Sequence, residues 1–356
     1  MPNPSTTDLN GDFVTSVGVK QRKIATETAI TASTTIDAKS VKSVGVTTVV
    51  CSSVLYVTNS ITNNVSVIDT NTNMVVDTIT GFSNPDGIVV NSKTNLVYVY
   101  NFVLAQDDAL SIIDATTNVI VNTVTDGRGV GQFGIAINES ENLLYLASND
   151  DISSYLIILD TISNQIIGTT TVPPDATGVA VDIQRNLIYV TSDTSGIVSV
   201  IDGDIGFVVT ATVNVGGSPQ GISVNELENK IYVATGGPNN LVSVINGNSY
   251  VVNATITVGD NPVGIAFNEE NNQIYVSNIV SSNISVIDGG LDIVTFTITG
   301  GEQPTVITID EDSNIVYVIN QATNNISVID GNSNELITTI TVGILPQGIT
   351  LFTPLC

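Results

Sequence analysis

The amino-acid sequence predicts an all-β protein in which seven four-stranded units close into a ring. An apolar strand centred on tyrosine recurs seven times, at Tyr56, Tyr98, Tyr145, Tyr189, Tyr232, Tyr275 and Tyr317. Successive tyrosines are separated by 42, 47, 44, 43, 43 and 42 residues, which is the length of one propeller blade. The strands are rich in Val, Ile, Thr and Tyr and are bounded by Asn, Asp, Gly and Pro, as in β-meanders. The predicted fold is therefore a seven-bladed β-propeller.

Each unit contains four predicted strands in a fixed order. The tyrosine strand, such as LYVTN at 55–59, is followed by an apolar strand such as VSVID at 65–69 and a Thr/Val strand such as VVDTIT at 75–80. A Gly/Pro loop then leads to a fourth strand, for example GIVV at 87–90. Many of these strands are apolar on both faces, which is typical of blades that stack against blades.

The two ends of the repeat region complete each other. The chain enters the first unit at the tyrosine strand, so blade one lacks its innermost strand, whereas GITLF at 348–352 is an innermost strand without a blade. Pairing the last strand with the first removes the open edges that a linear stack would expose. We therefore expect the C-terminal strand to complete blade one and to close the ring.

Both cysteines fall at this expected seam. When the hairpin of the sixth repeat serves as a template for the missing hairpin, Cys51 and Cys356 both fall in its turn. Their Cα atoms are then expected within the roughly 7 Å that a disulfide allows. We expect a Cys51–Cys356 disulfide, which would indicate an oxidising, exterior compartment. The alternative is a pair of unrelated thiols, one of them free to cross-link another molecule.

Charge divides the chain near Cys51. The chain has 34 acidic and 9 basic residues and a net charge of -25. The first fifty residues hold five cations and four anions, a net +1, which leaves four cations and 30 anions, a net -26, on residues 51–356. We therefore expect an N-terminal arm of residues 1–50 and a propeller of residues 51–356. Because so acidic a surface repels phosphate backbones, nucleic acid is not an expected partner.

The arm is rich in Thr, Ser, Ala and Val and repeats SVGV at 16–19 and 43–46. It alternates like a strand, and the predicted propeller is complete without it. Three interpretations follow: a disordered leader, a strap on a blade edge of the same molecule, or a strand donated to a neighbouring molecule. In the third case residues 1–50 mediate self-assembly, with their cations against the acidic face of the next molecule.

The elements LYVTN, NNVSVID and PxGIAV resemble the YVTN family of β-propeller repeats, which occurs in surface-layer and other cell-surface proteins. The resemblance covers residues 54–352 and implies the propeller fold. It implies no catalytic residue, because the family shares none. Some units depart from the pattern: SIID at 111–114 and LIILD at 156–160 differ, Asn246 replaces the usual Asp, and QPTVITI lacks the usual glycine.

Composition removes several classes of function. The chain contains no His and no Trp, which excludes His-dependent catalysis, His-ligated metals and Trp stacking platforms. No apolar run approaches the roughly 18 residues of a membrane-spanning helix, so no membrane span is expected. The N-terminus lacks the apolar region of a secretory signal. We expect an extracellular location, or one on the surface of a cell or spore, by an unidentified export route.

Strand order sorts the connections onto two faces of the ring. The loops after the tyrosine strand and before the innermost strand form an upper face, and the other two turns of each unit form a lower face. The lower face holds 19 of the 30 acidic residues, so divalent cations or basic partners are candidate ligands. The alternative is that each Asp caps a tight turn through Asx hydrogen bonds.

Calcium is the one ion for which the lower face offers a pattern. DTNTN at 69–73 and DGNSN at 330–334 resemble the start of a calcium loop, but no Glu follows at the twelfth position. The repeated hairpin explains the same spacing without a metal. The sequence therefore predicts no cofactor, with calcium as the open alternative.

The upper face of the longest unit carries the candidate binding site. Insertions there bring together charged side chains suited to a calcium ion or a sugar: Asp107, Asp108, Asp126, Arg128, Asp150 and Asp151. The alternative is a solvated loop cluster. GRGVGQ at 127–132 lacks the context of a phosphate loop, so nucleotide binding is not expected.

The prediction for function is non-enzymatic. We expect a structural and interaction module, extracellular or on a cell surface, that presents a rigid propeller to a protein or glycan partner. One alternative is a propeller hydrolase, lactonase or lyase with a metal at the funnel, although innermost strands such as GIAV and GISV predict an apolar channel. A second alternative is a lectin-like propeller, with ten tyrosines available for sugar stacking. No residue is predicted to be catalytic.

Overall fold

The computed structural model describes residues 53–102, 109–125, 131–149, 153–237 and 240–354. These residues form 28 strands in seven antiparallel four-stranded sheets, which are the seven predicted blades. Contacts within the chain group Ser52–Leu355 as one unit. No helix long and apolar enough to cross a membrane occurs in these ranges. The all-β, seven-bladed prediction is confirmed.

Each blade has an inner strand, two middle strands and an outer strand. From blade one to blade seven, the inner strands are β28 (Pro346–Phe352), β4 (Pro85–Asn91), β8 (Gly131–Asn138), β12 (Ala176–Asp182), β16 (Ser218–Asn225), β20 (Pro262–Asn268) and β24 (Pro304–Asp310). The first middle strands, which carry the tyrosines, are β1 (Val54–Asn59), β5 (Leu96–Asn101), β9 (Leu143–Asn149), β13 (Leu187–Ser192), β17 (Lys230–Gly236), β21 (Gln273–Asn278) and β25 (Ile315–Asn320).

The remaining strands continue each blade outward. The second middle strands are β2 (Asn64–Asp69), β6 (Ala109–Asp114), β10 (Ser154–Asp160), β14 (Ile197–Asp202), β18 (Leu241–Asn246), β22 (Asn283–Asp288) and β26 (Asn325–Asp330). The outer strands are β3 (Met74–Thr80), β7 (Val119–Thr125), β11 (Gln165–Val172), β15 (Val208–Asn214), β19 (Val251–Thr257), β23 (Ile293–Thr299) and β27 (Glu335–Thr341).

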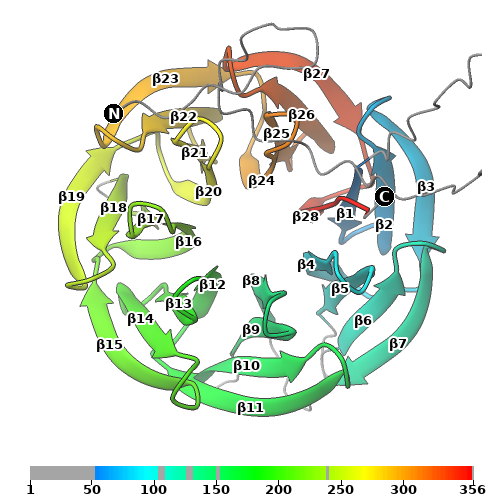
Figure 1. Ribbon diagram of the computed structural model, residues 1–356. Helices are drawn as coiled ribbons and strands as arrows, with labels where there is room; N and C mark the ends of the chain where they lie inside the picture. Colours follow the sequence, from blue (N-terminus) through cyan, green and yellow to red (C-terminus); the bar gives the residue numbers. More distant parts are fainter. Residues whose placement is uncertain (1–52, 103–108, 126–130, 150–152, 238–239, 355–356) are drawn as a thin grey trace, which may run out of the picture. The chain divides into compact units, whose positions relative to one another are not determined.

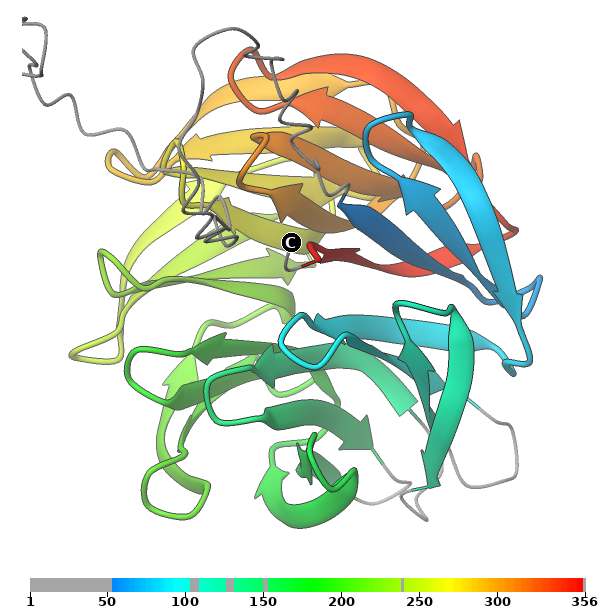
Figure 2. The same ribbon diagram turned by 45° about the vertical axis from the view of Figure 1, so that its right-hand side comes forward.

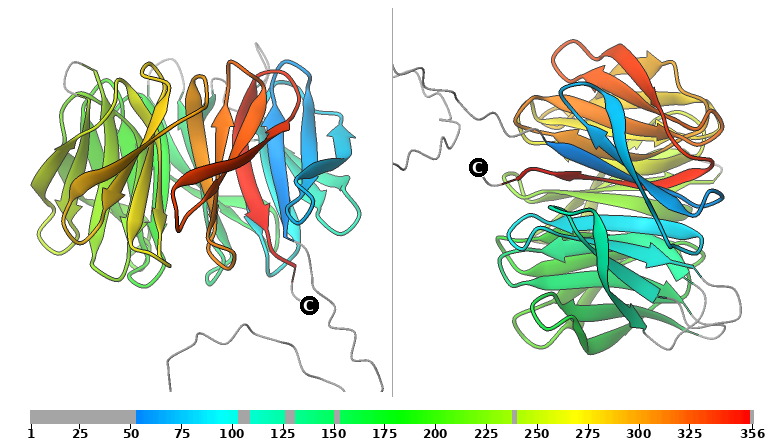
Figure 3. Two further views of the ribbon diagram at one scale, coloured as in Figure 1. Left: turned by 90° about the horizontal axis from the view of Figure 1, so that it is seen from above. Right: turned by 90° about the vertical axis from the view of Figure 1, so that its right-hand side faces the viewer.

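The inner strands lie around the centre of the ring, and each contacts the inner strands of its two neighbours (Figure 1). Seen edge-on, the strands of every blade run between the two faces of the ring (Figure 3). Because consecutive strands are antiparallel, the loops that precede inner strands and follow tyrosine strands share the upper face. The other turns share the lower face, as the sequence predicted.

The ring closes where the last strand pairs with the first. Strand β28 lies antiparallel to β1 (Figure 2), with Val54 opposite Phe352 and Tyr56 opposite Thr350. In blade six, Tyr275 lies opposite Ala266. In both blades the residue opposite the tyrosine is two positions after the glycine of the inner strand. The predicted closure of blade one by the C-terminal strand is confirmed.

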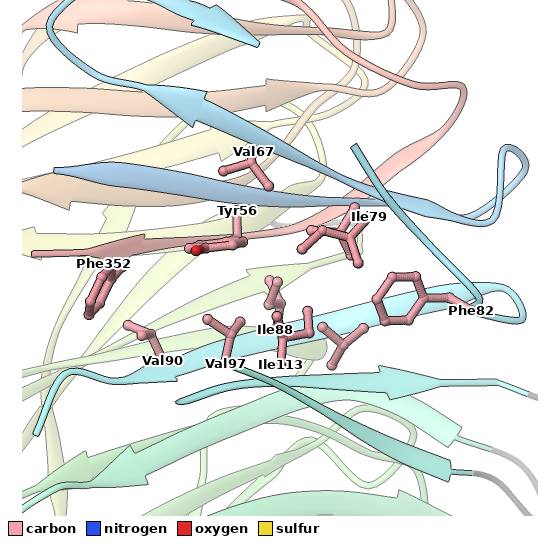
Figure 4. Close-up of a cluster of buried hydrophobic side chains, with 11 residues drawn as sticks. Tyr56, Val67, Ile79, Phe82, Ile88, Val90, Val97, Ile113 and Phe352 are labelled. Carbon is pink, nitrogen blue, oxygen red and sulfur yellow. The ribbon is translucent and has the colours of Figure 1, made fainter. Parts of the chain in front are cut away.

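The hydrophobic core is a series of layers between neighbouring blades. Between blades one and two, Tyr56 and Phe352 face Val90 and Val97 (Figure 4), and all four side chains are at most 8% exposed. Burying an aliphatic or aromatic side chain of this size contributes roughly 1.5–3 kcal/mol. Because each layer needs both of its blades, the strands are apolar on both faces.

Glycines set how closely neighbouring inner strands approach. A Cβ atom on Gly264 would lie 2.0 Å from the carbonyl oxygen of Thr305 on the next inner strand. The equivalent contact is 2.2 Å from Gly178 to the oxygen of Gln220. Val306 holds this position in blade seven and packs, partly buried, against blade one. The inner strand of blade seven therefore lacks the glycine contact that Gly264 and Gly178 show.

Tight turns explain the abundance of asparagine. Among the described residues, 22 non-glycine residues have positive φ and 15 of these are Asn, the residue that tolerates this conformation best after glycine. Examples are Asn73, Asn95 and Asn334, each of which ends a turn on the lower face. The regular spacing of Asn in the sequence is therefore a property of the hairpins.

Candidate functional site

The six residues of the predicted binding site, Asp107, Asp108, Asp126, Arg128, Asp150 and Asp151, lie outside the described residues. The strand ends on either side of them are described. Asn101 pairs with Ala109 in blade two, and Asn149 pairs with Ser154 in blade three. Both pairs lie at the upper face. The predicted residues between Asn101 and Ala109 and between Asn149 and Ser154 therefore connect strands that end on the predicted face.

Cys51 and Cys356 also lie outside the described residues. The nearest described residues are Ser53 and Pro354, two positions from each cysteine. The Oγ atom of Ser53 and the Oγ1 atom of Thr353 are 3.3 Å apart, which extends the β1–β28 pairing by one residue. The two cysteines therefore follow directly from neighbouring strand ends, and their disulfide stays a prediction.

One inner strand carries a carboxyl group near its upper end. Asp86 is the second residue of β4, and β4 is covered on its two sides by β28 and β8. Asp86 is nevertheless partly exposed. Its carbonyl oxygen accepts a 2.5 Å hydrogen bond from Thr58 Oγ1, which ties this position to blade one.

Burial raises the pKa of Asp86 to about 7. The surrounding protein removes most of the hydration of the carboxylate, which disfavours its charged form. Asp86 is therefore poised to take up or release a proton near neutral pH. A group with this property in a cleft is a candidate for acid–base chemistry or for pH-dependent binding.

Polar side chains hold the positions equivalent to Asp86 on other inner strands. The residue before the inner-strand glycine is Gln220 in blade five and Gln347 in blade one, both partly exposed. Gln347 Oε1 accepts a 2.6 Å hydrogen bond from Gln321 Nε2. The upper ends of the inner strands thus carry one carboxyl group and amide groups, at a position that precedes the apolar residues on which the expected apolar channel was based.

Asp86 is the functional candidate that sequence reasoning missed. Only three ionisable residues occur on the inner strands, and Asp182 and Asp310 are buried at their lower ends. The signal was the comparison of one repeat position: the residue before the glycine is an acid in blade two alone. The sequence alone shows this difference between the repeats, but the structure is needed to show that the strand with Asp86 is the inner strand of its blade.

Carboxylates of the lower face cap turns, as the Asx interpretation predicted. Asp69 Oδ1 accepts hydrogen bonds from the backbone N–H groups of Asn71 (2.9 Å) and Thr72 (3.0 Å). Asn246 caps its turn in the same way, with 3.0 Å bonds from Asn248 and Ser249, so an amide serves there as well as a carboxylate. Turn formation therefore explains the DTNTN spacing without a metal ion.

The cations of the lower face are held in contacts between repeats. Lys230 Nζ lies 2.9 Å from Glu228 Oε2 and 3.2 Å from Asp292 Oδ2 of the next blade. Burial lowers the pKa of Lys230, but hydrogen bonds with these carboxylates outweigh burial and raise it. Lys93 Nζ donates a 2.9 Å bond to the carbonyl oxygen of Glu139 on the next blade. These cations join blades and offset only a small part of the acidic charge.

The described part of the chain contains no group of three or more carboxylates or cysteines that could hold a metal ion. The metal-dependent alternative needs several acidic or amide ligands at one point. Asp86 alone does not meet this requirement, so the described residues do not fit a metal centre on the inner strands.

Comparisons with known proteins agree with the fold. Residues 222–341 match a family described as "Lactonase, 7-bladed beta-propeller". No curated protein matches the chain. Among solved structures, a functionally unknown protein from Desulfotomaculum acetoxidans DSM 771 has a TM-score of 0.72 at 16% identity, covering 85% of this chain and 99% of that chain.

A second similar structure is the hydrazine synthase of Kuenenia stuttgartiensis. Its TM-score is 0.68 at 18% identity, covering 78% of this chain and 92% of that chain. Identities this low show a shared fold and nothing of a shared reaction. The family match covers about a third of the chain and likewise identifies the architecture, a seven-bladed propeller.

Proposed function

We propose that this protein is a non-enzymatic structural and interaction module, extracellular or on a cell surface, that assembles through residues 1–50 and presents a rigid propeller to a protein or glycan partner. One observation carries the proposal. The seven blades and the seam use only residues 54–352, so the arm is not needed for closure of the ring. A strand-like segment that the seven sheets do not need can add to a sheet edge of another molecule.

Charge supports the same proposal. The arm has a net charge of +1, and residues 51–356 have a net charge of -26. An acidic disc repels its copies, and this repulsion keeps propellers apart unless a specific segment joins them. The five cations of the arm would reduce the repulsion at a contact between copies. The resemblance to YVTN repeats, which occur in cell-surface proteins, is consistent with a surface setting.

Sedimentation velocity of two chains tests the assembly. The full chain is expected to form multimers at micromolar concentration, and a chain lacking residues 1–50 is expected to be a monomer with the same melting temperature. A second variant keeps the full length and replaces Lys39 and Lys42 with Glu, which reverses two charges of the arm. A full chain that stays monomeric under all ionic strengths would overturn the proposal.

A lactonase-type hydrolase is the second candidate, because residues 222–341 match a lactonase propeller family and Asp86 titrates near neutral pH. In this alternative Asp86 acts as a general base toward water at the upper end of β4. The test is hydrolysis of simple lactones by the full chain and by Asp86→Asn. Turnover that disappears in Asp86→Asn, at unchanged melting temperature, favours the enzyme; no turnover in either chain removes it.

A further inference from the structure

All seven outer strands contain a bulge at the same position, and the type of residue at the bulge differs between the two sides of the ring. In every blade the pairing of the second middle strand with the outer strand shifts by one residue. In blade one, for example, Val67 pairs with Asp77 and Ile68 with Val75, so Val76 is left out as a bulge. The seven bulge residues are Val76, Val121, Ile167, Thr210, Asn253, Thr295 and Ile337.

The two threonine bulge residues have a structural task. Thr210 Oγ1 donates a 3.3 Å hydrogen bond to the carbonyl oxygen of Val200, and Thr295 Oγ1 donates one of the same length to Val286. Each carbonyl belongs to the residue beside the bulge, where the ladder is disrupted. Threonine therefore satisfies an acceptor that the bulge leaves free, and an aliphatic residue cannot.

Four blades have an aliphatic residue at this position, and it points to solvent. The exposed fractions are 60% for Val76, 55% for Val121, 53% for Ile167 and 53% for Ile337. Neither burial nor a hydrogen bond explains these residues, because water surrounds them and they have no polar group. Exposed apolar surface that serves no purpose in folding marks an interaction site.

The four aliphatic bulges are neighbours on the ring. They lie on β27, β3, β7 and β11, which follow one another around the perimeter (Figure 1). Further exposed apolar side chains of the same strands extend the surface: Met74, Val119, Ile166 and Leu336. We call the exposed apolar residues of β27, β3, β7 and β11 the apolar arc. An apolar cleft between blades two and three opens beside Ile166, so the arc is also indented.

The arc combines apolar side chains with open backbone groups. Each of its four strands is the last strand of its sheet, so its outward N–H and C=O groups are available to an added strand. Proteins commonly protect such edges with Lys or Pro, and none of these four strands contains either residue. The bulge is the remaining protection, and it leaves the longer part of each edge open.

Acidic residues border the arc on the lower face. Asp69, Asp114, Asp160 and Asp330 lie in the turns that precede its strands. Hydrogen bonds from Thr116 lower the pKa of Asp114, and backbone hydrogen bonds lower the pKa values of Asp160 and Asp330. Asp114, Asp160 and Asp330 are therefore anionic at neutral pH, and a segment that binds beside them is expected to combine apolar residues with cations.

Residues 1–50 have this chemistry. They contain Lys20, Arg22, Lys23, Lys39 and Lys42, and the segment SVGVTTVV at 43–50 is uncharged and β-branched. Fifty extended residues reach as far as about 170 Å, so the arm of one propeller reaches the perimeter of the next. We propose that the apolar arc is the docking surface for residues 1–50 of a neighbouring copy, which adds a strand to an outer edge. This inference rests on the proposed function and names its surface.

The chain supplies its own matched substitutions. Val76→Thr, Val121→Thr, Ile167→Thr and Ile337→Thr together give the arc the residue that blades four and six already have at the bulge. The control is Val208→Thr, Val251→Thr and Ile293→Thr, which are 49%, 55% and 50% exposed on the opposite side of the ring. Both variants retain every buried side chain, so melting temperatures equal to or above the original value are expected.

Two measurements test the proposal with full chains. In sedimentation velocity, the arc variant is expected to associate at least tenfold more weakly than the unaltered chain, and the control variant as strongly as the unaltered chain. In fluorescence anisotropy, a labelled peptide of residues 31–50 is expected to bind the propeller lacking residues 1–50, and at least tenfold more weakly after the four arc substitutions.

The outcomes separate the two proposals. If the full chain assembles through its arm but the arc variant assembles equally well, the arm docks elsewhere: the inference fails and the proposed function stands. If arc and control substitutions weaken assembly equally, the contact is unspecific and the inference also fails. A full chain that never assembles refutes the proposed function itself.

Discussion

The hydroxyl group of Tyr275 in blade six donates a 2.7 Å hydrogen bond to Oδ1 of Asn334 in blade seven. Tyr56 makes the same bond with Asn118 of the next blade, at 2.9 Å. In each pair the Asn has a positive φ, so it both shapes its turn and accepts a bond from the preceding blade. In these blades the repeated tyrosine and the repeated asparagine are therefore two halves of one contact with the next blade.

Removing this contact is expected to destabilise the ring. Tyr275→Phe leaves Oδ1 of Asn334, a residue only 8% exposed, without its donor, which costs about 1–3 kcal/mol of unfolding free energy. Burial raises the pKa of Tyr275 to about 12, so the hydroxyl remains a donor throughout the physiological range. Urea unfolding followed by circular dichroism gives the change.

Tyr145 is the matched control. Its position is equivalent, but its hydroxyl oxygen is buried without a partner among the described residues. The ring of Tyr145 instead meets Phe207 edge-on, with centroids 6.2 Å apart. Tyr145→Phe removes a buried, unsatisfied group and is expected to be neutral or stabilising. Equal losses in Tyr145→Phe and Tyr275→Phe would contradict the assigned role of the hydrogen bond.

Gly264→Ala tests the close approach of the inner strands. Its new Cβ atom would lie 2.0 Å from the carbonyl oxygen of Thr305, so the backbone of two blades must separate. A loss of roughly 3 kcal/mol is expected from this overpacking. Gly168→Ala in outer strand β11 is the control, since its nearest neighbour is a side-chain atom of Ile158 at 3.8 Å. Thermal unfolding of the two variants should differ clearly, and similar melting temperatures would argue against a packing limit between the inner strands.

Asp86 predicts a specific pH dependence. Its pKa is about 7 in the folded protein and 3.8 for an unburied carboxyl group. The folded state therefore holds the proton that the unfolded state releases between these values, so stability falls as pH rises from about 4 to 7 and is constant above. Asp86→Asn removes this effect of pH and is expected to stabilise the protein at pH 8, on the order of 4 kcal/mol, with little effect at pH 4. Urea unfolding from pH 4 to 8 checks the slope, and a slope unchanged by the substitution would refute the assignment.

The two cysteines give a redox prediction. Because Ser53 and Thr353 lie 3.3 Å apart at the seam, oxidised protein is expected to contain a Cys51–Cys356 bridge and no titratable thiol. Such a bridge closes a loop of about 300 residues, for which the chain-entropy model gives about 5 kcal/mol. Mass spectrometry of peptides identifies the bridge, and Cys51→Ser is the control for its stability effect. Two reactive thiols in oxidised protein, or dimers linked through sulfur, would show the alternative.

The fold was predictable because one period controls several physical features at once. Seven tyrosine strands at nearly constant spacing determine the number of blades. The C-terminal strand, which ends at Phe352 and has no blade of its own in sequence order, determines how the ring closes. The register of β28 on β1 follows from the template of blade six. Tyr56 lies opposite Thr350 and Tyr275 opposite Ala266, and each of these partners is two residues after the inner-strand glycine. Repetition turns local patterns into a statement about topology.

Other features depend on register and could not be predicted in this way. The bulge at Val76 arises from a shift between two strands, and the sequence alone does not show which residue of MVVDTIT is left unpaired. The sequence shows that Asp86 is the only acidic residue at its position in the seven repeats. Its raised pKa, however, is a result of burial in the folded protein. The six predicted binding residues, from Asp107 to Asp151, stay a prediction.

The seam has a mechanical consequence. Val54 and Phe352 face each other at the very end of the β1–β28 ladder, so a force that pulls Ser53 and Thr353 apart acts on one pair of residues at a time. Such a peeling geometry resists tension poorly, because the hydrogen bonds between the two strands break one after another instead of together. A covalent link just beyond these residues would carry the load past the ladder, and the ring would then withstand traction that the hydrogen bonds alone do not.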